Sequence, residues 1–85
     1  MGRVLYVEAT ADREADSLAM SALRDLAHSL EPRPGWVGAR LLRNTADPRV
    51  LLLELNWDGP EASLEGLLPI LPGVKIRSWA FESLD

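Results

Sequence analysis

The chain has no cysteine and only one histidine, His28, among its 85 residues. Without cysteine there is no disulfide framework, no thiol nucleophile and no zinc site built on thiolates. A Ser-His-Asp set, a glycine-rich phosphate loop and a metal-spaced cluster are also missing from the sequence. Charges or prolines interrupt every apolar run before it reaches membrane-spanning length. We therefore expect no bound metal, no flavin or other cofactor, and no membrane as a partner.

The charge balance is acidic, with 13 Asp and Glu against 9 Lys and Arg and a net charge of −4. Nucleic-acid-binding domains usually present basic surfaces, so nucleic acid is not expected as a partner. The N-terminal segment reaches Glu8 too early for the apolar region of a signal peptide, which favours a cytoplasmic protein. Residues 1–85 suffice for one small domain with a modest core, and an oligomer interface is a common source of added stability for such a domain.

The most apolar stretch is Arg49–Trp57, and turn residues follow it at once. A run of this length with such boundaries is typical of a buried strand. Asp58 is a suitable N-cap for a following helix, and Pro60 suits the first turn of that helix. The sequence therefore predicts a central strand that leads into a helix from about Pro60 to Leu68.

Apolar residues recur at helical spacing from about Arg13 to Leu30, which predicts the first and longer helix. Strands are predicted over Val4–Thr10, Trp36–Arg43 and Val74–Glu82, where β-branched and aromatic residues are frequent. The order is thus strand, helix, strand, strand, helix, strand. This βαββαβ order indicates a ferredoxin-like α+β fold, with a four-stranded antiparallel sheet and both helices on one face. The fold alone does not indicate a function.

Alternation along the strands divides the side chains between the two faces of the sheet. The helices should cover the more apolar set, which is Leu5, Val7, Ala9, Val37, Ala39, Leu41, Leu51, Leu53, Leu55, Val74, Ile76 and Ala80. The other face mixes aromatic residues, arginines and carboxylates, a composition that protein interfaces favour. We expect it to form an isologous homodimer interface that contains Tyr6, Glu8, Trp36, Arg40, Leu42, Leu52, Glu54, Arg77, Trp79 and Phe81. The alternative is a partly exposed sheet with scattered aromatic residues.

Three motifs are similar to those of the antibiotic-biosynthesis-monooxygenase family, within the dimeric α+β barrel superfamily. They are Pro34-Gly35-Trp36, Asp47-Pro48, and Glu54-Leu55-Asn56-Trp57-Asp58-Gly59-Pro60-Glu61-Ala62, and the similarity spans nearly the whole chain. The resemblance implies that two protomers pack sheet against sheet to close a barrel, with a pocket between the sheet and the helices. Some members of that family oxidise phenolic polyketides to quinones with oxygen and without metal or flavin. Relatives cleave haem.

The chain departs from the family pattern in its second helical segment. Members commonly have a longer helix that ends in a histidine, and the haem-degrading branch uses this histidine as its iron ligand. Ser63–Leu71 contains no histidine, so haem degradation is not expected. The resemblance then implies a cofactor-independent monooxygenase that acts on a small aromatic or polyketide-type substrate. Two alternatives are open: a dimeric barrel that binds a small ligand without turnover, and a structural or accessory protein.

Asn56 and Trp57 are the candidate catalytic residues, because Trp57 matches the family's tryptophan at the end of the third strand. Trp57 has two possible roles, stacking on an aromatic substrate and plugging the end of the core, and the second is commoner for tryptophan. Asn56 either polarises a substrate oxygen or makes local hydrogen bonds. His28 falls nearly opposite the apolar stripe of its helix and is interpreted as a solvated surface residue rather than a catalytic base.

Glu8 and Glu54 lie on the same predicted sheet face as Arg40 and Arg77. Such carboxylates and guanidinium groups suit either a catalytic pair or structural ion pairs across a dimer. We favour ion pairs, because a buried charge without a partner is costly.

Overall fold

The structure is a computed structural model and describes residues 2–59, 64 and 66–85. The elements are β1 (Gly2–Ala11), the 3-10 turn η1 (Arg13–Ala15), α1 (Asp16–Leu30), β2 (Trp36–Arg43), β3 (Val50–Asp58) and β4 (Val74–Glu82). The four predicted strands and the first predicted helix are all present, with bounds that differ by only a few residues. The ferredoxin-like α+β fold is thereby confirmed.

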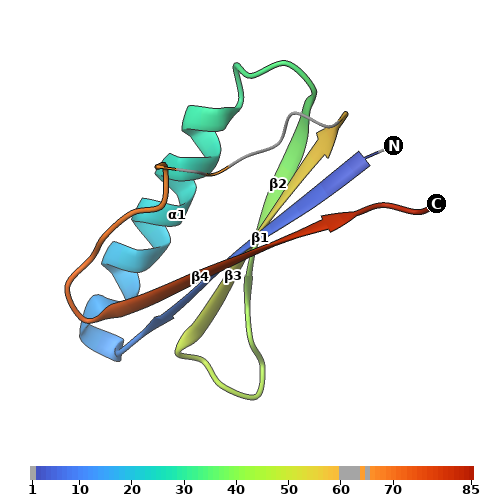
Figure 1. Ribbon diagram of the computed structural model, residues 1–85. Helices are drawn as coiled ribbons and strands as arrows, with labels where there is room; N and C mark the ends of the chain where they lie inside the picture. The colour runs from blue at the N-terminus through green and yellow to red at the C-terminus, as the bar shows by residue number, and fades with distance from the viewer. Residues whose placement is uncertain (1, 60–63, 65) are drawn as a thin grey trace.

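The four strands form one antiparallel sheet in the order β2-β3-β1-β4, so β1 and β3 are internal and β2 and β4 are edge strands. Helix α1 lies across one face of this sheet, and the segment that leads into β4 runs along the same side (Figure 1). We call this side the helix face. The opposite side, which no described element covers, is called the open face.

The core lies between α1 and the internal strands. Side chains of β1 and β3 alternate between buried and half-buried over almost their whole lengths. The buried apolar residues are Leu5, Val7, Ala9, Ala11, Ala19, Leu23, Leu26, Leu30, Leu51, Leu53, Leu55, Trp57 and Leu64. Burying one leucine fully contributes about 1.5–3 kcal/mol relative to leaving it in water. The alternation predicted for Leu51, Leu53 and Leu55 therefore supplies the sheet side of the core.

An ion pair joins the start of α1 to the end of β2. Arg43 donates through Nη1 and Nη2 to the two carboxylate oxygens of Asp16, at 2.8 and 3.0 Å. The same guanidinium also donates to the carbonyl of Pro48 in the β2–β3 turn. One side chain thus connects the helix, the strand and the turn. Within the described residues, no helix has the length and apolar character needed to cross a membrane.

The second predicted helix, from about Pro60 to Leu68, is not found in the part of its span that the structure describes. Residues 66–68 form a turn, in which the Leu67 amide donates to the Leu64 carbonyl at 2.9 Å. Gly66 has a φ of +74°, a left-handed conformation that ends any right-handed helix at that residue. The rest of the predicted helix, residues 60–63 and 65, lies outside the described residues.

A bulge in β2 reverses the predicted faces of two residues. The strand register passes from Trp36 opposite Trp57 to Gly38 opposite Asn56, so Val37 is an additional residue on the β2 side. Trp36 consequently packs against the core, whereas Val37 is 65% exposed. The prediction that Trp36 belongs to the open face, and Val37 to the helix face, is wrong. One inserted residue shifts the alternation of a strand by one position, and the sequence carries no evident signal for it.

Candidate functional site

An open pocket of about 770 Å³ lies at the β4 edge of the helix face, between β1, β4 and described residues that precede β4. Its described lining residues are Leu5, Leu64, Gly66, Leu68, Pro69, Ile70, Ile76, Ser78, Trp79 and Ala80. Sites for small molecules typically have volumes of about 300–1,000 Å³. This cavity, which we call the β4 pocket, is therefore large enough for a small polycyclic compound.

The position of α1 explains why the pocket forms at this edge of the sheet. Helix α1 packs over β1, β2 and β3, and the segment that leads into β4 runs along the same side of the sheet (Figure 1). Along the helix face, Ile76, Ser78 and Ala80 stand opposite the buried residues of β1. Ser78 and Ala80 are small and remain exposed, so they do not fill the space beside the core.

The lining of the β4 pocket is apolar. Ser78 supplies the only side-chain hydroxyl among the described lining residues, and none of these residues carries a carboxylate, imidazole, amine or guanidinium group. The part of the chain that the structure describes contains no group of His, Asp or Glu residues that could hold a metal ion. These described residues can pack against an aromatic compound, and none of them is a titratable group that could transfer a proton.

The two candidate catalytic residues lie on opposite faces of β3, and neither lines the β4 pocket. Trp57 is 3% exposed, and its ring meets that of Trp36 edge to face, with centroids 5.1 Å apart. This geometry is that of a core plug, the commoner of the two roles considered for Trp57. Asn56 lies on the open face and donates from Nδ2 to Oε1 of Glu54 at 3.2 Å. The local hydrogen-bonding role considered for Asn56 matches this contact.

A hydrogen-bonded cluster surrounds Glu54 near the middle of the open face. Besides the amide of Asn56, the Glu54 carboxylate accepts bonds from Arg40 Nε and Nη2 at 3.2 Å and from the Tyr6 hydroxyl at 3.3 Å. Arg40 lies on β2 and Tyr6 on β1, so the cluster spans three strands. The Glu54 side chain is 14% exposed.

The protonation equilibria of Glu54 and Tyr6 follow from this cluster. The hydrogen bond from Asn56, supported by those from Arg40 and Tyr6, holds the pKa of Glu54 below its ordinary value, although burial acts in the opposite direction. Burial, followed by the negative charge of Glu54, raises the pKa of Tyr6. The cluster is therefore most stable with Glu54 ionised and Tyr6 neutral.

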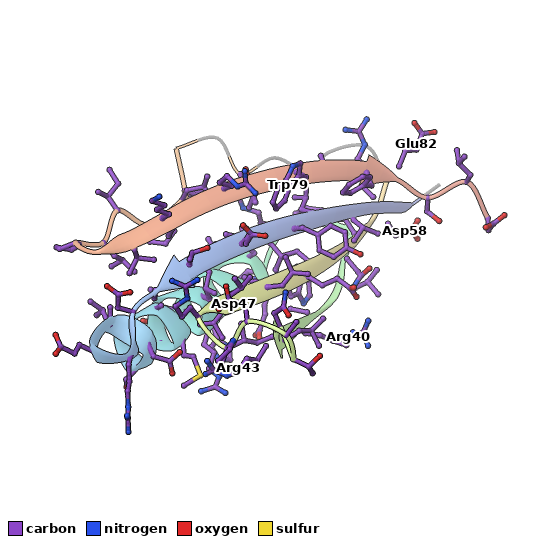
Figure 2. The ribbon with its side chains drawn as sticks, turned by 90° about the horizontal axis from the view of Figure 1, so that it is seen from below. Arg40, Arg43, Asp47, Asp58, Trp79 and Glu82 are labelled. Atoms are coloured by element: carbon purple, nitrogen blue, oxygen red, sulfur yellow. The ribbon has the colours of Figure 1, made fainter. Side chains whose placement is uncertain are left out.

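A second ion pair and two aromatic contacts lie towards the β4 edge of the open face. Arg77 donates to Oε1 of Glu8 at 3.3 Å, and its guanidinium lies 5.1 Å from the ring centroid of Trp79. Tyr6 meets Phe81 edge to face at 5.6 Å. Figure 2 shows Trp79 and Arg40 towards opposite edges of the sheet. The structure thus brings together the predicted open-face set, apart from Trp36, and pairs its charged members within one chain.

His28 lies on the surface, as predicted from its helical position. Its side chain is 74% exposed, and its Nδ1 atom lies 2.9 Å from Oε1 of Glu31. Neither residue lines the β4 pocket.

A smaller cleft of about 480 Å³ lies near the start of α1 and is bordered by Arg13, Arg43 and Arg49. Arg43 pairs with Asp16, and Arg49 pairs with Asp47 at 3.0 Å. Two of the three guanidinium groups are therefore already neutralised by carboxylates. This cleft is better explained as a structural ion-pair region than as an anion site.

The sequence interpretation missed Ser78 and residues 66–70 as lining residues. A signal was present on β4, where the helix-face positions run from Ile76 to the smaller Ser78 and Ala80. Small residues at positions that should face a helix leave unfilled volume beside the core.

No protein-family profile matches the sequence, and no curated protein is significantly similar to it. Several solved structures share its fold. The Mycobacterium tuberculosis protein Rv0793 aligns with a TM-score of 0.69 and 13% identity, over 100% of this chain and 97% of the other. MhuD, a haem degrader of M. tuberculosis solved with two haems in its active site, aligns with a TM-score of 0.67 and 18% identity, over 96% and 95%.

A candidate antibiotic biosynthesis monooxygenase from Nitrosomonas europaea aligns with a TM-score of 0.67 and 14% identity, over 98% of this chain and 90% of the other. Identities this low establish the fold alone. The chain has the α+β fold of antibiotic-biosynthesis-monooxygenase-like proteins, and the resemblance noted in its sequence motifs is confirmed at this level.

Proposed function

We propose that the chain binds a small aromatic molecule in the β4 pocket and oxygenates it without metal or flavin. The observation that carries this proposal is the apolar pocket itself, whose described lining offers one hydroxyl and no charged group. The monooxygenase-like fold supports the choice of reaction. The described lining residues carry no charge and suit an uncharged aromatic substrate, because an unpaired charge placed against them would be costly.

The reaction we propose is the oxidation of an activated methylene group, as in an anthrone, by molecular oxygen. The CH₂ group becomes a carbonyl, and the second oxygen atom leaves as water. The substrate supplies all the electrons, so no reductant is needed. Binding would hold the substrate in one orientation. Since the described lining contains no base, the substrate's proton would pass to solvent, and the rate would follow the substrate's own ionisation.

The test compares the turnover of the unmodified protein with that of a variant whose pocket is filled by a large side chain. Purified protein is mixed with an anthrone in air-saturated buffer without added cofactor, and formation of the anthraquinone is followed by absorbance. Ala80→Trp places a large side chain in the pocket and should abolish acceleration over buffer. Ala46→Trp makes the same substitution in the exposed β2–β3 turn and should leave the rate unchanged. Absence of acceleration by the unmodified protein would refute the oxygenase activity.

Binding without turnover is the second candidate function. The same lining favours it, because none of the described lining residues can transfer a proton. Under this alternative the protein binds aromatic ligands, and Ala80→Trp blocks binding, but oxygen consumption never exceeds the rate in buffer. Haem is not proposed as a ligand, because no histidine occurs among the described lining residues and His28 lies on the surface.

We further infer that two copies of the chain associate through their open faces. Trp79 and Phe81 are 38% and 54% exposed there, and the half-buried Leu52 lies on the same face. A face with this much aromatic surface and no covering element is typical of an interaction site. Arg40 and Glu54 already pair within the chain, which lowers the cost of removing their charges from water. The sequence resemblance to a dimeric family supports the same arrangement.

A further inference from the structure

We propose that the ion pair of Arg40 with Glu54 makes the open face selective for a second copy of this chain, because the pair keeps the centre of that face electrically neutral. This inference rests on the proposed association of two copies through their open faces. It adds the two residues that decide whether identical faces can meet.

The centre of the open face is the place where Tyr6 stands opposite Glu54. Strands β1 and β3 are internal, and their register pairs residues 2–10 with residues 50–58 in antiparallel order, so this pair lies midway along both strands. Arg40 of β2 stands opposite Glu54 on its other side. For two such faces to overlap over most of their area, a two-fold axis between the sheets has to pass close to these residues, whatever its direction. The centre of one face then meets the centre of its copy.

A net charge at this centre would be repeated on both faces. In an isologous contact, each residue near the two-fold axis faces its own equivalent in the second copy, so an uncompensated charge meets a charge of the same sign. Like charges brought together in an interface oppose association strongly. Identical faces can therefore meet only if the charge at the centre is compensated within each chain or exchanged evenly between the two.

Arg40 and Glu54 provide this compensation within one chain. Oε1 of Glu54 accepts hydrogen bonds from Arg40 Nε and Nη2 and from Asn56 Nδ2, all at 3.2 Å. Oε2 accepts from the Tyr6 hydroxyl at 3.3 Å and from Arg40 Nη2 at 3.2 Å. The Glu54 side chain is only 14% exposed, so its carboxylate is already largely withdrawn from water in the single chain, whereas that of Arg40 is 66% exposed. The centre thus presents a formed ion pair rather than a free carboxylate.

The rest of the open face has the same charge balance. The open-face positions of the four strands hold three carboxylates and three cations, which are Glu8, Glu54, Asp58, Arg40, Lys75 and Arg77. The whole chain carries a net charge of −4, so its excess of carboxylates lies outside these positions. A face without net charge is compatible with an identical copy, whereas it offers a strongly basic or acidic partner no electrostatic attraction.

The test changes the charge at the centre with little change in side-chain size. Arg40→Gln leaves the carboxylate uncompensated, and Glu54→Gln leaves the guanidinium uncompensated. In sedimentation equilibrium at low salt, each variant should raise the dissociation constant of self-association at least about tenfold, and high salt should reduce this difference. Arg24→Gln and Glu14→Gln make the same substitutions at exposed positions outside the open face and should change the constant less than about twofold.

Mixing the two central variants separates an effect of charge from an effect on folding. The centre of Arg40→Gln is negative and that of Glu54→Gln is positive, so the mixed dimer should form at least about tenfold more tightly than either variant alone. Native mass spectrometry of copies with different mass tags measures the three dimers, and circular dichroism confirms that the variants are folded. If either variant does not fold, the neutral double variant Arg40→Gln/Glu54→Gln replaces the mixture and should associate as the unmodified protein does.

The outcomes distinguish this inference from the proposed association. If the unmodified protein is a monomer at micromolar concentration, the proposed association fails, this inference fails with it, and the open face serves a different occupant. If the unmodified protein is a dimer and both central variants associate as tightly, or if mixing does not restore association, the ion pair does not decide the contact and only this inference fails. Weakening in each central variant with recovery in the mixture supports the assignment.

Discussion

Replacing Trp57 by phenylalanine should weaken the fold and leave the β4 pocket intact. Trp57 is 3% exposed at the end of β3, and its ring packs edge to face against Trp36. Truncating a buried tryptophan to alanine costs about 3–5 kcal/mol. Phenylalanine keeps one aromatic ring, so we expect a smaller cost of about 1–3 kcal/mol in the free energy of unfolding.

This cost is large for a domain of this size. At ~0.05–0.15 kcal/mol per residue, the 85 residues correspond to a free energy of unfolding of about 4–13 kcal/mol. Trp57→Ala would therefore remove about a quarter or more of the stability, and for that reason the milder Trp57→Phe is the better probe. Trp36→Phe is the matched variant, because Trp36 is only half-buried and should cost less.

The assay is urea unfolding followed by far-ultraviolet circular dichroism at one fixed protein concentration, since association would add to the apparent stability. The two single variants and the double variant form a cycle, whose coupling energy should be about 0.5–1.5 kcal/mol for an edge-to-face pair. The affinity for an anthrone is measured in parallel and should not change. If Trp57→Phe left the urea midpoint unaltered but lost ligand affinity, Trp57 would contribute to the binding site rather than to the core, and this reasoning would be refuted.

Three further predictions concern the open face. Leu52→Asp should convert the proposed dimer to monomers in sedimentation experiments, and a wild-type chain that sediments as a monomer at micromolar concentration would contradict the dimer itself. Because the pKa of Glu54 is lowered in the folded protein, its ionised carboxylate stabilises the fold at pH values above its ordinary pKa of 4.5. This contribution is lost as the pH falls through the lowered pKa, so Glu54→Gln should lose less stability in acid than the unmodified protein. The same variant should lower the pKa of Tyr6, measured from tyrosinate absorbance, but not below its ordinary 10.0, because burial is the larger cause of the shift. An unchanged Tyr6 titration would show that Glu54 does not act on the hydroxyl.

Most of the fold could be predicted because the two periodicities of the sequence are unambiguous in its long elements. The stripe along residues 13–30 requires a helix with one apolar face, and α1 buries that face through Leu23, Leu26 and Leu30. Alternation in residues 50–57 requires a strand with one buried face, and β3 follows it without exception. Patterns of this kind are dictated by burial, which is the largest favourable contribution to folding.

The failures occurred where one residue or one conformation overrides a pattern. The bulge at Val37 changes the faces of two side chains, although the sequence around it still alternates. The positive φ of Gly66 ends helical geometry inside a segment whose prolines and acids suggested a short helix. Backbone features of this type depend on tertiary contacts, so a reading of local composition does not find them.

The candidate site was harder to predict than the fold, because the pocket depends on side chains that are small rather than on side chains that are reactive. Asn56 and Trp57 were predicted as site residues because they carry a polar and an aromatic group. Asn56 instead completes a cluster on the open face, and Trp57 fills the core. The pocket forms instead where Ser78 and Ala80 stand on an edge strand that α1 does not cover. The described lining carries no charged side chain, so catalysis by these residues would depend on the reactivity of the substrate and on the orientation in which the pocket holds it.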